Sequence, residues 1–312
     1  MKPADVKLGN QLRSSLLEFD INMRHLPGIQ NQLYRECLIE QMIDSIRRIR
    51  YVKIIQNKTS EVCTHPMNIA FDPFKAAVYF KKHGNINEAF WMVFLGTHFG
   101  KNKNSKWELV KAIYGALNSE NNWTWERTSS DIDGFRRWLN ENQQEIKGNN
   151  GFGNHRKYQS LGAYNERGTG STIASYVDWI GEKRDHLMMI NDRFDNEIVN
   201  DPKRFFNALY KSLSYVKGFG RTAKFDFLTM VGKIELLKII PNSTYMLEAT
   251  GPKRGAKLLF GGNINFSINV RLLETYLQEL EEHLNLYFGM QVLEDSLCNW
   301  QKSPSNYVHF GG

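Results

Sequence analysis

Residues 212–230, SLSYVKGFGRTAKFDFLTM, contain the clearest indication of the fold. One apolar helical pattern leads into Lys217-Gly218-Phe219-Gly220-Arg221, and a second helical pattern follows. Two glycines two residues apart between helices predict a very tight hairpin. The hairpin could be a plain helix C-cap, or its amides from Phe219 to Thr222 could hold a phosphate at a helix N-terminus, with added charge from Lys217 and Arg221.

Composition narrows the class of protein. The chain has 312 residues and is 41% hydrophobic, enough to bury a sizeable core. No apolar run approaches the roughly 18 residues that a membrane span needs, and the N-terminus MKPADVKLGN lacks the apolar stretch of a signal peptide. Three distant cysteines without zinc-site spacing predict reduced thiols in the cytoplasm and no bound metal. The net charge of +7 suits a nucleic-acid partner without requiring one.

Helical periodicity dominates the chain, and few segments alternate with period two, so the sequence predicts an all-α fold with at most a minor hairpin. Asp72-Pro73 fits a helix start, with Asp at the cap and Pro in the first turn. A Gly-rich, basic and aromatic segment over 147–171 predicts a long functional or disordered loop. The expected helices cover residues 9–25, 30–55, 73–82, 87–99, 107–118, 131–146, 172–189, 203–216, 222–239, 252–260 and 267–287.

Asp226 is a candidate catalytic carboxylate on the helix after the hairpin. It lies at the margin of that helix's apolar face, where a carboxylate costs free energy unless it is paired or hydrogen-bonded. Two explanations stay open: an ion pair with an arginine from another helix, or a carboxylate that stabilises an oxocarbenium-like state or activates water.

A second candidate site lies in EQMIDSIRR. Its polar residues are three or four positions apart and so share one helix face: Gln41, Asp44, Arg47 and Arg48. Such a face is usually solvated, but an amide, a carboxylate and two guanidinium groups could also recognise a base edge and its phosphate.

Further candidates for binding DNA lie in three other places. His98 and Lys101 end the most apolar helix, where a histidine is often a core residue. FGNHRKYQSL combines hydrogen-bonding, cationic and stacking groups that suit a flipped base or a single strand. Lys253 and Arg254 surround a helix start at Pro252, where a second anion site is plausible. The residues of the loop are Asn154, His155, Arg156, Lys157 and Tyr158.

Several stretches together resemble the alpha-glutamyl/putrescinyl thymine pyrophosphorylase clade 3 family. They run from about residue 34 to 262 and include YRECLIEQMIDSIRRIRY, NEAFWMVFLGTHFGKN, GFGRTAKFDFLTMVGK and STYMLEATGPKRGAKLLFGG. The resemblance implies an offshoot of the helix-hairpin-helix DNA glycosylases, with the motif at about 203–239 of a single unit over 1–312. It also makes Glu248, about twenty residues beyond the hairpin, a rival to Asp226 and Asp44 as the catalytic carboxylate.

The resemblance implies an enzyme that flips a modified pyrimidine out of double-stranded phage DNA. Related bacterial proteins in antiphage defence excise glucosylated 5-hydroxymethylcytosine and leave abasic sites, so alpha-glucosyl-5-hydroxymethylcytosine is the first choice of substrate. The lysine of bifunctional glycosylases is out of register, because Arg221 and Thr222 take its place and Lys224 follows. A monofunctional, cytoplasmic bacterial enzyme is therefore expected.

That enzyme would need no cofactor, no membrane and no obligate protein partner. Some relatives of the fold hold a monovalent cation at the hairpin, and the sequence leaves open whether this chain does. Two other functions also stay open: a transferase or pyrophosphorylase that modifies hydroxymethylpyrimidines in DNA, and a DNA-binding module without enzymatic activity.

Overall fold

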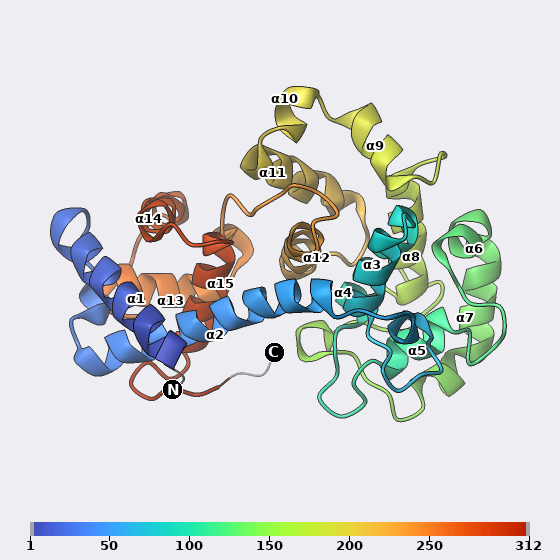
Figure 1. The fold of residues 1–312 in the computed structure, drawn as a ribbon, viewed down its shortest axis with the longest axis horizontal. Helices are drawn as coiled ribbons and strands as arrows, with labels where there is room; N and C mark the ends of the chain where they lie inside the picture. The colour runs from blue at the N-terminus through green and yellow to red at the C-terminus, as the bar shows by residue number, and fades with distance from the viewer. Residues whose placement is uncertain (1–2, 310–312) are drawn as a thin grey trace. The chain divides into compact units, whose positions relative to one another are not determined.

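The computed structural model describes residues 3–309, and this part of the chain contains fifteen α-helices and no β-strand (Figure 1). The predicted all-α fold is confirmed. The helices are α1 Pro3–Asn22, α2 Gln32–Asn57, α3 Pro73–Lys82, α4 Ile86–Phe99, α5 Glu108–Tyr114, α6 Trp125–Ser130, α7 Ile132–Lys147, α8 Thr169–Ile180, α9 His186–Arg193, α10 Asn196–Val199, α11 Pro202–Ser212, α12 Arg221–Lys233, α13 Gly251–Gly261, α14 Val270–Leu284 and α15 Gly289–Trp300.

The chain forms two compact units. Unit 1 combines Met1–Tyr51 with Ile240–Gly312, and unit 2 is Val52–Ile239, so the boundary falls inside α2. The expected single glycosylase-like unit over 1–312 stays a prediction, and its residues 1–2 and 310–312 lie outside the described part.

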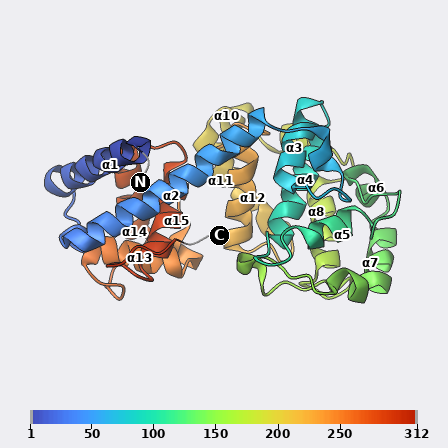
Figure 2. The same cartoon turned by 60° about the horizontal axis from the view of Figure 1, so that its bottom comes forward.

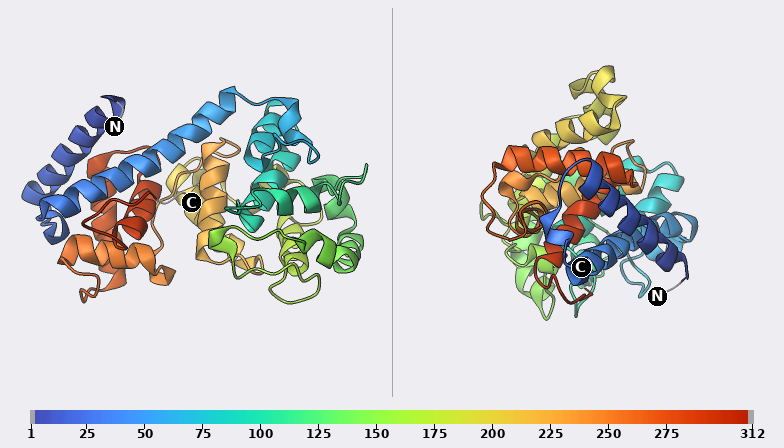
Figure 3. Two further views of the ribbon diagram at one scale, coloured as in Figure 1. Left: turned by 90° about the horizontal axis from the view of Figure 1, so that it is seen from below. Right: turned by 90° about the vertical axis from the view of Figure 1, so that its left-hand side faces the viewer.

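Unit 1 brings the two ends of the chain together around one apolar core. In Figure 3 the blue α1 and the first part of α2 run beside the orange and red helices α13, α14 and α15. Leu16, Phe19 and Trp300 are completely buried in this core. The Trp300 indole also donates a hydrogen bond of 2.9 Å to the Tyr34 carbonyl of α2, which ties the last helix to the second.

Unit 2 is built around α4, INEAFWMVFLGTHF, whose residues from Glu88 to Phe99 are all buried. Figure 2 shows α3 and α8 next to α4, and α12 also packs against it. The Phe94 ring of α4 stacks on the Tyr176 ring of α8 with 3.9 Å between centroids. Asp72 caps α3 by accepting hydrogen bonds from the Phe74 and Lys75 amides, as its sequence predicted.

The structure corrects several helix boundaries. The helix expected over 172–189 is two helices, because Gly181 ends α8 with a φ of +93° and the Asp185 side chain caps α9. The helix expected over 222–239 ends at Lys233. The helices α6, α10 and α15 were not predicted, although Leu293, Leu297 and Trp300 give α15 a regular buried face.

Candidate functional site

The hairpin joins α11 to α12 through a short 3-10 turn, Leu213–Tyr215, and the residues up to Gly220. Gly218 has a φ of +73°, and a Cβ there would lie 2.9 Å from the Thr172 hydroxyl, so the fold itself requires this glycine. Gly220 is different, because its φ is −72° and an added Cβ would meet nothing within 4 Å. Gly220 is also the N-cap of α12, without a side-chain cap hydrogen bond. No side chain at the N-cap position therefore covers the start of α12.

The rest of the hairpin is anchored in unit 2. The Lys217 amide donates to the Ser175 hydroxyl at 2.9 Å, while the Lys217 side chain is exposed. Phe219 is buried and stacks on Phe94 with 5.3 Å between centroids. Arg221 is also buried, 5.8 Å from the Phe225 ring centroid, and Thr222 is half-buried. The exposed groups of the hairpin are thus fewer than the sequence suggested.

The basic Gly-rich loop packs onto this hairpin. The Gln159 side-chain amide donates to the Gly218 carbonyl at 3.1 Å, and the Gly153 amide donates to the Phe99 carbonyl at 2.8 Å. The two anchors lie at the ends of the short segment that the sequence had singled out. Gln159 was not predicted, since nothing local distinguishes a glutamine that contacts a turn 59 residues away.

Arg156 joins the loop to both α4 and α12. It is buried, and its guanidinium donates to the carbonyls of Thr97 at 2.8 Å and His155 at 3.1 Å. Its third contact is an ion pair of 2.8 Å with Asp226, whose side chain is 41% exposed. Asp226 therefore has the arginine partner that one of its two explanations required, supplied by the loop rather than by a helix. Arg156 is thus placed to hold the loop against α4 and α12.

The exposed side chains of the two segments, with the Gly220 amide, are called here the hairpin–loop surface. Tyr158 is 90% exposed and Tyr215 is 71% exposed. Tyr215 was not predicted to be part of a binding surface, because the sequence places it in the preceding helix. The other exposed side chains of this surface are Asn154, His155, Lys157 and Lys217.

His98 and Lys101, at the end of α4, have different environments. His98 is buried, and burial, followed by the nearby Arg156 charge, lowers its pKa to about 3. The Thr169 hydroxyl donates to the Ser160 carbonyl at 2.8 Å, so it must accept from His98 Nε2, 3.0 Å away. His98 is thus a neutral, hydrogen-bonded core residue. The Lys101 side chain is exposed, with Nζ 5.7 Å from the Trp107 ring centroid.

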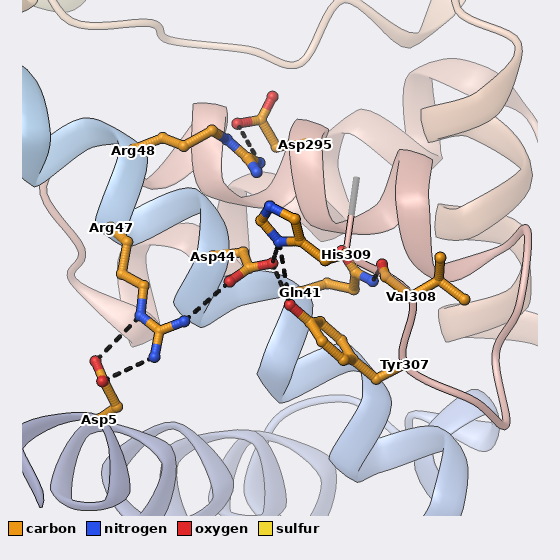
Figure 4. A network of polar contacts seen from close by, with 9 residues as sticks. All are labelled: Asp5, Gln41, Asp44, Arg47, Arg48, Asp295, Tyr307, Val308 and His309. Atoms are coloured by element: carbon orange, nitrogen blue, oxygen red, sulfur yellow. Dashed lines mark hydrogen bonds and ion pairs between the residues drawn. The ribbon is translucent and has the colours of Figure 1, made fainter. Parts of the chain in front are cut away.

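In unit 1, Asp44 lies at the centre of a polar network (Figure 4). It is 4% exposed, and it accepts hydrogen bonds from Arg47 at 3.1 Å, from His309 Nδ1 at 2.8 Å and from the Tyr307 hydroxyl. Burial alone would raise the pKa of Asp44, but the hydrogen bonds from Tyr307 and His309 outweigh it and lower the pKa below 3.8. Arg47 also pairs with Asp5 at 2.8 Å. The carboxylate is therefore an enclosed anion.

The other two polar residues of this α2 face also have partners. Arg48 forms an ion pair of 3.3 Å with Asp295, and the buried Gln41 side chain donates to the Val308 carbonyl at 2.9 Å. The segment after α15 thus covers Gln41 and Asp44, whereas the Arg47 and Arg48 side chains on the same face stay 46% and 39% exposed. Tyr307 and His309 were not predicted, because no sequence pattern connects them with a helix more than 260 residues earlier.

The region around Glu248 is open. Glu248 is exposed at the end of the 3-10 turn Met246–Glu248, shortly before α13. Lys253 Nζ donates to the Leu247 carbonyl at 3.2 Å, and Arg254 is exposed. Thr250 is the N-cap of α13 but makes no side-chain cap hydrogen bond. This placement is compatible with the anion site expected there.

Within residues 3–309, no group of three or more His, Cys, Asp or Glu side chains is arranged to hold a metal ion. Over the same residues, every helix is too short or too polar to cross a bilayer.

Comparison with known proteins identifies the family. No curated protein and no solved structure matches the chain. The family model described as alpha-glutamyl/putrescinyl thymine pyrophosphorylase clade 3 matches residues 33–312, which include the hairpin, the loop, α2 except its first residue and the segment after α15. The name of this family describes an enzyme acting on modified thymine. The chain belongs to the alpha-glutamyl/putrescinyl thymine pyrophosphorylase clade 3 family.

Proposed function

We propose that this protein is a DNA glycosylase that flips a hypermodified pyrimidine out of phage DNA and hydrolyses its N-glycosidic bond. The observation that carries the proposal is the hairpin–loop surface, in which a side-chain-free helix start is flanked by exposed cations and aromatic rings. The preferred substrate is alpha-glucosyl-5-hydroxymethylcytosine in double-stranded DNA, and the product is an abasic site that serves antiphage defence.

Gly220 supports a backbone grip on phosphate. The first amides of α12 have no intrahelical acceptors, and the helix dipole favours an anion there. The chain's own conformation does not require glycine at this position, because φ is −72° and the space is open. Absence of a side chain is useful there if another molecule must approach closely. The exposed Lys217 adds a charge to that contact.

Tyr158 and Tyr215 support contact with bases. The two rings are 90% and 71% exposed, so packing in the core does not stabilise them. Stacking of an aromatic ring on an unpaired base contributes about 1–3 kcal/mol of binding free energy. The neighbouring Lys157 Nζ lies 5.1 Å from the Tyr158 ring centroid, so charge and ring are presented together. Asn154 and His155 add hydrogen-bonding groups. Such a surface suits DNA from which one nucleotide has been displaced.

Three carboxylates remain candidates for the chemical step. Asp226 and Glu248 are accessible, whereas Asp44 is enclosed and would act through the groups bound to it. Cleavage of the bond develops positive charge on the sugar, which a carboxylate stabilises, and water then completes the substitution. The variants Asp226→Asn, Glu248→Gln and Asp44→Asn rank the three by how far each lowers the rate of base release while DNA binding persists.

The first experiment compares DNA that carries glucosylated hydroxymethylcytosine with unmodified DNA. Released base is measured by mass spectrometry and abasic sites with an aldehyde probe. Release from the modified DNA alone is expected. Release from neither DNA, with a range of modified phage DNAs also inert, would rule out the glycosylase.

Gly220→Asp tests the grip separately from the chemistry. Aspartate is a favourable N-cap and should leave the protein as stable or more stable, but its charge should repel phosphate. DNA affinity is expected to fall about tenfold or more, which is the effect of about 1.4 kcal/mol. Asn196→Asp is the control, because Asn196 is exposed in α10 of the same unit and gains the same charge. Equal affinity of both variants would show that α12 does not bind phosphate.

The family description favours one alternative, a pyrophosphorylase or transferase that attaches a group to an activated pyrimidine. Product mass separates the two activities: a transferase adds mass to DNA and needs a second substrate, whereas a glycosylase releases a base. Binding without either change would leave a DNA-binding module.

A further inference from the structure

The polar network on α2 contains an exposed imidazole held by a buried carboxylate. The His309 side chain is 66% exposed, whereas that of Asp44 is 4% exposed, and 2.8 Å separates His309 Nδ1 from Asp44 Oδ2. An ionised carboxylate only accepts hydrogen bonds, so His309 Nδ1 carries the proton. The neutral ring therefore has its lone pair on Nε2, to which no described residue donates. This is the arrangement of a general base whose ring is oriented by a carboxylate.

The network holds an exposed ring in one orientation at a cost in folding free energy. Burying a carboxylate carries a desolvation cost that its hydrogen-bond donors must offset. Apolar residues in its place are often at least as stabilising. Here the partners come from Tyr307, His309 and Arg47, and none of them extends the apolar core. The Gln41 amide additionally holds the Val308 carbonyl, between the two residues that contact Asp44. Tyr307 and His309, on either side of Val308, are thus both held against α2.

A second histidine–aspartate pair in unit 1 belongs to an ordinary turn and differs from the His309–Asp44 pair. The His25 side chain is also 66% exposed, and its Nδ1 is 2.9 Å from Asp20 Oδ1. Asp20, however, also accepts from the Leu26 amide and the Gln30 side chain, so it closes the local turn after α1. The His25–Asp20 pair lies outside the family match over 33–312, and the His309–Asp44 pair lies within it.

We infer that His309 is a catalytic general base of the proposed reaction and that Asp44 is the positioning residue that orients it. This inference rests on the proposed glycosylase. His309 Nε2 takes a proton from water while the water oxygen bonds to the anomeric carbon of the deoxyribose. The bond from that carbon to the pyrimidine nitrogen breaks, and its electron pair leaves with the base. The departing base takes up a proton from solvent, and the imidazolium returns its own to solvent.

The charges around the pair favour such a role. Charged or titratable groups come from every element that surrounds Asp44 and His309: Glu40, Arg47 and Arg48 on α2, Asp5 on α1, Asp295 on α15, and Tyr307 beside the ring. Asp44 supplies the negative charge that stabilises the imidazolium once Nε2 has accepted a proton.

The test uses the full-length protein and the modified DNA on which the wild type is active. His309→Gln retains a donor for Asp44 but lacks a base, and single-turnover base release is expected to slow about 100-fold or more with unchanged DNA affinity. The wild-type rate should depend on pH, and this dependence should change in His309→Gln. Added imidazole should partly restore the rate of His309→Gly. His25→Gln is the matched control and should keep the wild-type rate and pH profile.

The outcomes separate the two proposals. A wild type that releases base, with His309→Gln equally fast or without rescue of His309→Gly by imidazole, overturns the role of His309 and leaves the glycosylase standing. A wild type that releases no base from any modified DNA refutes the glycosylase and, with it, the assigned step. Thermal unfolding of each variant shows that it is folded, which the exposure of both histidines leads us to expect.

Discussion

Asp44 and Glu88 are both buried carboxylates, one in each unit, and their pKa values move in opposite directions. Asp44 is 4% exposed with three side-chain donors, and its pKa is lowered. Glu88 is 5% exposed, and its donors are the Trp125 amide, 2.8 Å from Oε2, and the Tyr114 hydroxyl. Burial raises the pKa of Glu88 to about 7. Equal burial thus produces an anion or a partly protonated acid, depending on the donors that surround it.

This difference bears on function. A carboxylate that stays ionised can orient a histidine and stabilise its charged form, as Asp44 is placed to do. Glu88 lies within the buried face of α4, and its donor Trp125 is itself buried, so its protonation bears on the stability of the fold.

The largest effect should come from Glu88→Gln. Because the folded state raises the pKa of Glu88 from 4.5 to about 7, its contribution to stability is complete below pH 4.5 and is lost as the pH rises through about 7. Glutamine cannot ionise. The free energy of unfolding of the variant, relative to wild type, should therefore rise by about 3 kcal/mol between about pH 4 and pH 8 in urea titrations. Glu197→Gln, on the exposed surface, should show no such rise. A pH-independent difference would mean that Glu88 is not titrating in this range.

Asp44→Asn should give the opposite pH dependence. An amide cannot accept from all three donors, so a loss of about 2 kcal/mol is expected at neutral pH. Because the folded state lowers the pKa of Asp44, the wild-type advantage is present above about 3.8 and is lost as the pH falls through the folded-state pKa. Urea titrations near pH 7 and pH 3 measure the change. A penalty that grows in acid would contradict the assignment of Asp44 as an enclosed anion.

Tyr307→Phe removes one donor and keeps the ring. The expected cost is about 1 kcal/mol, and the pKa of Asp44 should move up toward its ordinary value. Carboxyl ¹³C NMR titration follows the group directly. Tyr158→Phe serves as the control, since that hydroxyl belongs to a side chain that is 90% exposed. An unchanged Asp44 pKa would show that His309 and Arg47 suffice.

Asp226→Asn should have the smallest effect on stability, about 1 kcal/mol, because the asparagine oxygen can still accept from the buried Arg156, which also keeps its bonds to the Thr97 and His155 carbonyls. Its effect should be local: faster amide hydrogen exchange in residues 153–160, where Arg156 loses its ion pair. A large global loss would place Asp226 with the buried carboxylates instead.

Much of the fold could be predicted from local pattern. Asp72-Pro73 and the three- and four-residue spacing of Leu38, Met42 and Ile46 marked α3 and α2, because caps and apolar periodicity act within a few residues. The split between α8 and α9 was missed, although Gly181 and the charged residues after it, in GEKRD over 181–185, interrupt the apolar pattern. The buried helix α15 was missed although its pattern was present.

The candidate site was predictable only in part. Gly218 and Gly220 were recognised together, but their different roles depend on what a Cβ added at each position would meet. Arg156 and Tyr158 looked equivalent in a basic loop, yet one is buried against Asp226 and the other is exposed. Residue type therefore indicated the chemistry available, and burial decided which groups remain accessible.

The all-α class, the turn at Gly218 and the resemblance to the family follow from local sequence, because helix periodicity, caps and turns depend on neighbouring residues. Only the tertiary structure decided that Asp44 meets His309, 265 residues away, and that Asp226 is held by Arg156. Pairs so distant form when the folded backbone brings two segments together. Their hydrogen bonds then set the charge and orientation of each group, which no local pattern encodes.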